Sequence, residues 1–124
     1  MNRVLLILIS FFIAFEIKSI EDLVGRNLIC RGKYQIIGYE FLTQNKVIRH
    51  ASSVSESDYY KNSGLYALTS EFVSLDVDGD IFVRKILRKS LELFIGEHFE
   101  NSKVGECNFY LGNLSKYFNT LNVR

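Results

Sequence analysis

The sequence predicts a mainly β protein, either an antiparallel coiled sheet or a small up-and-down barrel of seven or eight strands, with a short C-terminal helix. Three observations support this prediction. Apolar and polar residues alternate with a period of two in several short segments, as half-buried strands require. Turn-forming residues separate these segments every 8–12 residues or so. The two cysteines, Cys30 and Cys107, fall in the first and the last of these segments.

The first 19 residues are typical of a cleavable signal peptide. Arg3 precedes a nearly unbroken apolar run over residues 4–15, and charged residues follow it directly. A helix of that length reaches only about 18 Å, whereas a bilayer core is roughly 30 Å thick. A signal peptide, cleaved after Ser19 or alternatively after Ala14, therefore explains the segment better than a membrane span. We expect an exported protein, periplasmic or secreted, with no stable membrane insertion after cleavage.

Residues 20–124 have the length of a single domain. Without the three charged residues of the signal peptide, 13 basic and 13 acidic residues remain. A chain with no net charge has no long-range field for nucleic acid or for an anionic membrane. We therefore expect no nucleic-acid partner.

The first half of the domain divides into short strands and one long loop. Alternation predicts strands over residues 27–31, 34–42 and 46–50. The polar, serine-rich stretch 52–64 is predicted as the longest loop, and its Tyr59 and Tyr60 are the best candidates for contact with a protein partner. A strand over residues 65–69 then either continues into residues 72–77 or bulges before them.

A hairpin around Asp78 and Gly79 organises the middle of the chain, because this dipeptide is the strongest short hairpin signal present. A three-residue loop with Gly79 in the left-handed conformation pairs Leu75 with Ile81 and keeps one face apolar. A two-residue loop would turn that face over, so we predict the three-residue loop. The predicted buried face comprises Val73, Leu75, Val77, Ile81, Val83 and Leu87.

Residues 81–95 fit either two strands joined by a turn near residues 88–90 or one helix that ends at Gly96. We predict strands, because the segment follows a hairpin turn and is rich in alternating and β-branched residues. The last strand is expected over residues 106–111, with Phe109 and Leu111 on the same face as Cys107. Asn113 is expected to cap a short amphipathic helix that plugs an open end or covers an edge.

Cys30 and Cys107 are predicted to form a disulfide, because export makes pairing the default. A bond between the first and last strands favours a barrel or a strongly coiled sheet over an open one. A redox pair or a metal-thiolate site is disfavoured, since the sequence holds no C-x-x-C motif and no histidine cluster.

No motif predicts an enzyme, a cofactor or a metal site. His50 and His98 are isolated in the sequence, and the aspartates around the hairpin fit neither frame of a calcium loop. Arg84 and Arg88 would share one face of a strand and could contact a small anion. An exposed face that protects a strand from edge pairing is the more ordinary explanation for this basic cluster.

Together with an early and a late cysteine, three short motifs resemble those of a group of small exported bacterial β-rich proteins: GYEF at residues 38–41, NKV at 45–47 and RKSLEL at 88–93. The similarity spans most of the chain after the signal peptide and implies no catalytic residue. In general plan the chain also resembles exported lysozyme inhibitors of the small-barrel type, which likewise pair two cysteines, although their inhibitory loop motif has no match here.

These features predict a non-catalytic interaction module that acts on an envelope or extracellular protein. The alternative is a carrier of a small apolar ligand inside a barrel. In that case the cavity would be lined by Phe41, Leu75, Val83, Leu93 and Phe109.

Overall fold

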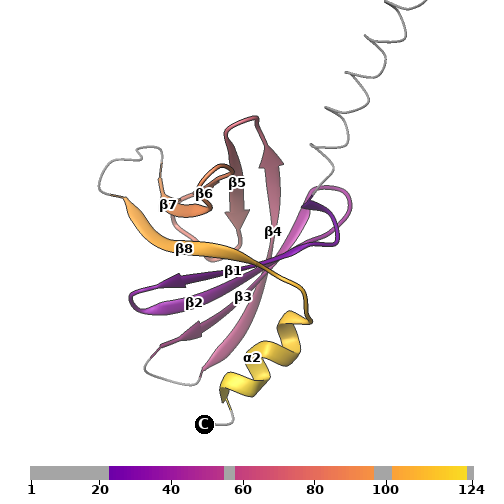
Figure 1. Ribbon diagram of the computed structural model, residues 1–124, viewed down its shortest axis with the longest axis vertical. Coiled ribbons are helices and arrows are strands. Elements are labelled where there is room, and N and C mark those ends of the chain that lie inside the picture. The colour runs from indigo at the N-terminus through magenta and orange to yellow at the C-terminus, as the bar shows by residue number, and fades with distance from the viewer. Residues whose placement is uncertain (1–22, 55–57, 97–101, 123–124) are drawn as a thin grey trace, which may run out of the picture.

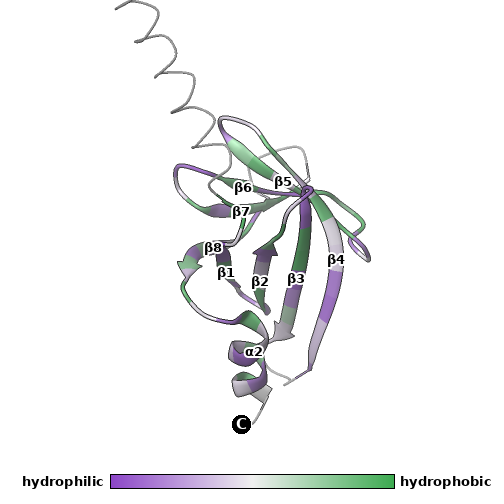
Figure 2. Cartoon of the chain, turned by 90° about the vertical axis from the view of Figure 1, so that its right-hand side faces the viewer, coloured by the Kyte–Doolittle hydropathy of each residue, from purple (hydrophilic) through white to green (hydrophobic). Residues whose placement is uncertain are grey.

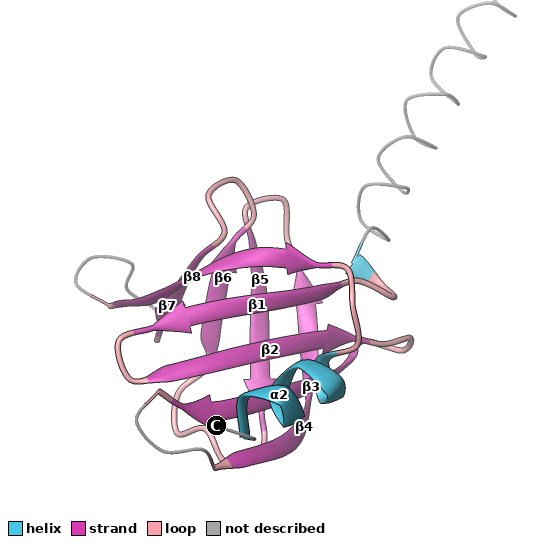
Figure 3. Ribbon diagram, turned by 60° about the horizontal axis from the view of Figure 1, so that its bottom comes forward, coloured by secondary structure: helices cyan, strands magenta, loops and turns pink. Residues whose placement is uncertain are grey.

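A computed structural model describes residues 23–54, 58–96 and 102–122, so the predicted signal peptide lies outside the described residues. Eight antiparallel strands close into a barrel in the order of the sequence, and a helix lies against its outer surface (Figures 1 and 3). The predicted β class, its antiparallel pairing and its C-terminal helix are confirmed, and of the two alternatives the closed barrel is right. The elements are β1 (Asn27–Gly32), β2 (Gln35–Phe41), β3 (Lys46–Ser53), β4 (Tyr59–Leu68), β5 (Phe72–Val77), β6 (Arg84–Leu87), β7 (Glu92–Ile95), β8 (Lys103–Tyr110) and α2 (Leu114–Asn122).

The barrel closes because β1 pairs with β2 on one side and with β8 on the other. Cys30 lies opposite Cys107 in the β1–β8 ladder, and the two form a disulfide. The bond therefore joins the first strand to the last at the seam of the barrel, as the sequence predicted. Among the described residues, no helix is both long and apolar enough to cross a membrane.

The inward side chains fill the barrel. Tyr39, Phe41 and Leu75 have no exposed surface, and Ile86 is equally buried. The inward face also includes Leu28, Cys30, Ile37, Val47, Ala51, Tyr66, Val73, Val77, Leu93 and Cys107.

The two ends of the barrel differ. One end, called the β5–β6 end below, carries the connections β1–β2, β3–β4, β5–β6 and β7–β8. The opposite end carries the remaining connections, and the buried side chain of Leu23 packs into the core there.

The long loop predicted over residues 52–64 is wrong. β3 runs on to Ser53, and β4 begins at Tyr59 and pairs with β3 along its first seven residues. The first half of β4 is hydrophilic and its second half hydrophobic (Figure 2), which explains why the sequence suggested a loop. Nor does β4 continue into β5: a turn separates them, in which the backbone N–H of Phe72 donates to Thr69 Oγ1 at 3.0 Å.

The predicted hairpin register is also wrong. Leu75 pairs with Arg84 rather than with Ile81, and Val73 pairs with Ile86. The connection is therefore six residues long, from residue 78 to residue 83, and Ile81 at its tip is 90 % exposed. Gly79 does have the expected positive φ, at 92°. Ile86 takes the core position that the prediction gave to Val83, because Asp80 is buried between Arg49 and Arg84.

Residues 84–95 form two strands and not a helix, which confirms that choice, while residues 81–83 belong to the β5–β6 connection. The two strands are β6 and β7, and a turn over residues 88–90 joins them. The last strand starts earlier than predicted, at Lys103. Its Cys107 is buried, but Phe109 is 46 % exposed and Leu111 is fully exposed, because both lie at or beyond the strand's end.

Helix α2 covers the outer face of β2, β3 and β4 rather than plugging an open end or covering an edge (Figure 3). Asn113 caps it as predicted: its Oδ1 accepts a hydrogen bond of 3.0 Å from the backbone N–H of Lys116. Leu114 and Phe118 are buried against the barrel. Gly38 makes this approach possible, since a Cβ there would lie only 2.9 Å from Phe118 Cε2.

Candidate functional site

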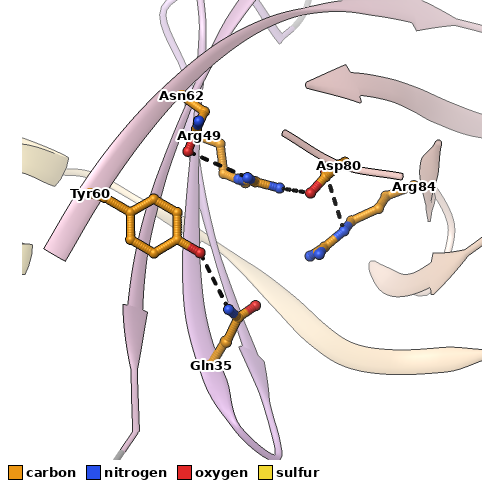
Figure 4. Close-up of polar contacts among 6 residues, drawn as sticks. All are labelled: Gln35, Arg49, Tyr60, Asn62, Asp80 and Arg84. Atoms are coloured by element: carbon orange, nitrogen blue, oxygen red, sulfur yellow. Dashed lines mark hydrogen bonds and ion pairs between the residues drawn. The ribbon is translucent and has the colours of Figure 1, made fainter. Parts of the chain in front are cut away.

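Three ionic side chains meet inside the barrel at its β5–β6 end. Arg49 points inward from the middle of β3, Arg84 points inward from the start of β6, and Asp80 reaches in from the β5–β6 connection (Figure 4). Asp80 Oδ1 pairs with Arg49 Nη1, and Asp80 Oδ2 lies 3.4 Å from Arg84 Nε. Asn62 Oδ1 accepts a further hydrogen bond of 3.4 Å from Arg49 Nη2.

These charges are largely withdrawn from water. The side chains of Arg49, Asp80 and Arg84 are 5 %, 9 % and 15 % exposed. Two guanidinium groups share one carboxylate, so the cluster holds one positive charge in excess. Within the described part of the chain, Tyr39 Oη, Arg49 Nε and Asp80 Oδ2 are buried without a hydrogen-bond partner. Burial of this kind costs free energy that packing elsewhere must offset.

The phenol of Tyr39 belongs to the same environment. Burial raises the pKa of Tyr39 to about 12, and the nearby charges of Arg84 and Arg49 oppose part of that rise. The phenol therefore stays neutral at physiological pH and adds no negative charge that would balance the two arginines.

The β5–β6 connection displays apolar side chains on the outside of the same end. Ile81, Phe82 and Val83, called the apolar tip below, are 90 %, 62 % and 41 % exposed. Two backbone hydrogen bonds hold the segment: Asp80 N–H donates to Val77 O at 3.1 Å, and Gly96 N–H donates to Val83 O at 2.9 Å. The connection thus places one of its two aspartates, Asp80, in the barrel and its apolar residues in solvent, the reverse of the usual arrangement.

A pocket of about 480 Å³ opens beside the three charges. Arg84 and Gln35 both line the pocket, and Gln35 Nε2 donates to Tyr60 Oη at 3.4 Å. The apolar floor consists of the Cys30 disulfide half, Ile37, Leu93 and Ile95, and the rim consists of Gly32, Lys33, Tyr34, Lys103 and Val104.

The aromatic residues predicted for partner contact lie on opposite faces of β4. Tyr59 faces outward under helix α2, where its ring stacks on Phe118 with a centroid distance of 5.3 Å. Its hydroxyl lies 2.7 Å from His50 Nδ1. Tyr60 faces the barrel end and is 41 % exposed. The two tyrosines therefore do not form one contact surface, because successive residues of a strand point to opposite faces.

Arg84 and Arg88 are not brought together either. Arg84 begins β6 and lies within the barrel, whereas Arg88 follows the strand's last residue. There its Nη1 donates to Thr69 O at 2.8 Å, at the opposite end of the barrel. The two residues could share a small anion only if they lay at the same end.

His50 lies in an aromatic stack on the outside of the barrel. It is fully buried beneath α2, with Nε2 3.1 Å from Glu40 Oε1. Burial lowers the pKa of His50, and the hydrogen bond and charge of Glu40 oppose that effect. His98 lies outside the described residues. Within the described ranges, no three histidine, cysteine, aspartate or glutamate residues are grouped so that they could hold a metal ion.

Sequence reasoning missed the ion cluster, although one signal was present. Arg49 lies between Val47 and Ala51, two apolar residues on the inward face of β3. A charged residue in the apolar phase of a strand indicates a buried partner of opposite sign, and that partner is Asp80.

Comparisons of this chain with protein-family models, with curated proteins and with solved structures gave no match. The resemblances to small exported β-rich proteins and to lysozyme inhibitors therefore stay predictions.

Proposed function

We propose that this protein is an exported, non-catalytic interaction module that docks on an envelope or extracellular protein through the apolar tip. The observation that carries the proposal is the inverted β5–β6 connection, with Asp80 buried between two arginines while Ile81 and Phe82 stand in solvent. The disulfide is compatible with export, because such bonds persist in oxidising compartments.

Exposing apolar residues and burying a charged one in the β5–β6 connection costs free energy, which suggests that the exposed tip has a function. In the alternative register, Ile81 and Val83 would face the core and no aspartate would be buried. The protein instead buries Ile86 in the place of Val83 and exposes Ile81, whose side chain would contribute about 1.5–3 kcal/mol if buried. A fixed apolar tip of this kind is suited to insertion into a hydrophobic pocket of a partner, where large side chains supply most of the binding free energy.

The carrier alternative has less support. Of the residues expected to line a cavity, Phe41, Leu75 and Leu93 are packed in the core at 0–1 % exposure. Val83 and Phe109 lie outside it, at 41 % and 46 % exposure. Side chains therefore fill the middle of the barrel, where a carrier would have to enclose an apolar ligand.

A crosslinking experiment tests the docking surface directly. A photoreactive phenylalanine analogue in place of Phe82 should crosslink to one defined envelope or extracellular protein. The same analogue at Leu65 is the matched control, because Leu65 is 59 % exposed but lies near the opposite end of the barrel. The double variant Ile81→Ser and Phe82→Ser should abolish binding of the identified partner while the melting temperature stays the same. Equal crosslinking from both positions, or unchanged binding by the double variant, would refute the proposal.

A further inference from the structure

We propose that the pocket at the β5–β6 end binds a small amphipathic carboxylate, with the carboxylate on Arg84 and the apolar part of the ligand on the floor of the pocket. This site lies inside the rim of the barrel and is separate from the apolar tip, so it goes beyond the docking role proposed above.

Charge is the first observation in its favour. The ionic residues that line the pocket are Lys33, Arg84 and Lys103, all of them basic. Lys103 is already neutralised, because its Nζ lies 2.8 Å from carboxylate oxygens of both Glu92 and Glu106. Lys33 is exposed and lies over the ring of Tyr34 at 5.4 Å. Arg84 is therefore the partly buried cation towards which an anion in the pocket would be drawn.

The excess charge of the ion cluster is the second observation. Asp80 is the one carboxylate that pairs with Arg49 and Arg84 among the described residues. Arg84 meets it only through Nε, and Figure 4 shows the end of its guanidinium directed away from Asp80. A planar guanidinium binds a carboxylate through two parallel hydrogen bonds. A bound monoanion would supply the one negative charge that the cluster lacks.

The shape and lining of the pocket indicate the rest of the ligand. A volume of about 480 Å³ is within the range of small-molecule sites. Ile37 and Leu93 close the bottom of the pocket at only 4 % and 1 % exposure, so the apolar surface that a ligand can cover comes mainly from Tyr34, Ile95 and Val104 around them. Gln35, which lines the same pocket as Arg84, offers an amide that can donate to the second oxygen of a carboxylate. A charged head and a short apolar body fit these surfaces together, whereas a fully polar anion would leave the floor uncovered.

A matched pair of probes tests the proposal. Octanoate and its neutral counterpart octanamide have the same chain and differ in charge. Titration followed by NMR chemical shifts should show one saturable site for octanoate, with the shifts centred on Gln35 and Ile95. Octanamide should bind about ten- to a hundredfold more weakly, the ratio expected when a charge-assisted hydrogen bond is lost.

Substitutions test whether Arg84 causes the preference for octanoate over octanamide. Arg84→Gln should remove the preference for octanoate over octanamide, whereas Arg88→Gln, at the far end of β6, should keep it. Since Arg84 also faces Asp80, Lys33→Glu provides a second variant that is exposed and so leaves the fold intact. It should weaken binding of octanoate several-fold and leave that of octanamide unchanged. The proposal is overturned if octanoate does not bind saturably, if both probes bind equally to the wild-type protein, or if the preference survives in both Arg84→Gln and Lys33→Glu.

Discussion

Replacing Asp80 by asparagine should destabilise the barrel more than any other single exchange of a carboxylate for its amide among the described residues. Asp80 and Arg49 are 9 % and 5 % exposed, so water cannot take over the role of the lost charge. Removing one partner of such a pair leaves a buried guanidinium uncompensated, which costs about 3–5 kcal/mol. Asparagine keeps the shape and one acceptor oxygen, so we expect the lower limit, about 3 kcal/mol.

The assay is reversible unfolding of the oxidised protein in urea and by heat. For a domain of this size each kcal/mol lowers the melting temperature by roughly 4–8 °C, so the expected drop is roughly 12–24 °C. Asp78→Asn is the matched control, because this carboxylate is exposed and accepts only a hydrogen bond of 3.4 Å from Ser63 Oγ. Its cost should stay within about 0.5 kcal/mol.

A double-mutant cycle tests whether the loss of stability comes from the interaction between Asp80 and Arg49. Arg49→Met removes the other partner with an apolar side chain of similar length, and the two costs should be strongly non-additive when combined with Asp80→Asn. If Asp80→Asn costs no more than Asp78→Asn, or if the two substitutions are additive, the buried ion pair does not hold the β5–β6 connection and the explanation of the register is wrong.

Three further predictions concern the helix interface, pH and the buried phenol. Gly38→Ala should destabilise by about 1–3 kcal/mol, measured by urea unfolding, because the new methyl group would collide with the buried ring of Phe118; no change would contradict the packing of α2. Burial lowers the pKa of His50 from 6.5, so the unfolded chain takes up a proton at a higher pH than the folded one. The unfolding free energy should therefore fall as the pH decreases below about 6.5; His50→Gln should remove that dependence. Since burial raises the pKa of Tyr39 to about 12, Tyr39→Phe should change the tyrosine absorbance titration only in its most alkaline phase, and a loss of amplitude near pH 10, the usual phenol range, would refute that assignment.

The parts of the fold that follow local rules could be predicted from the sequence. Two cysteines in the first and last strands favoured a barrel or a strongly coiled sheet, because a bond between them requires those strands to meet, but they did not decide between the two. The helix, its buried face and its cap at Asn113 follow from spacing and from one side-chain hydrogen bond. These predictions needed no knowledge of what packs on the other side of each element.

The parts that depend on distant partners could not be predicted in this way. The first half of β4 is polar on both faces, yet it is a strand, because Asn62 faces the buried Arg49 on the inside and Tyr59 faces α2 on the outside. The prediction of the hairpin register was wrong for a related reason. The rule that apolar residues face inward favoured Ile81 and Val83, but it takes no account of a carboxylate drawn inward by two arginines.

Asp80 contributes to stability and lies between the apolar tip and the pocket. The two proposed activities can nevertheless be tested separately. The Asp80 carboxylate meets Arg84 at Nε, and the end of the guanidinium points away from Asp80, so one arginine can hold the connection and face the pocket together. Substitutions in the apolar tip should therefore leave octanoate binding intact, since neither Ile81 nor Phe82 lines the pocket. Substitution of Lys33 should in turn leave docking intact.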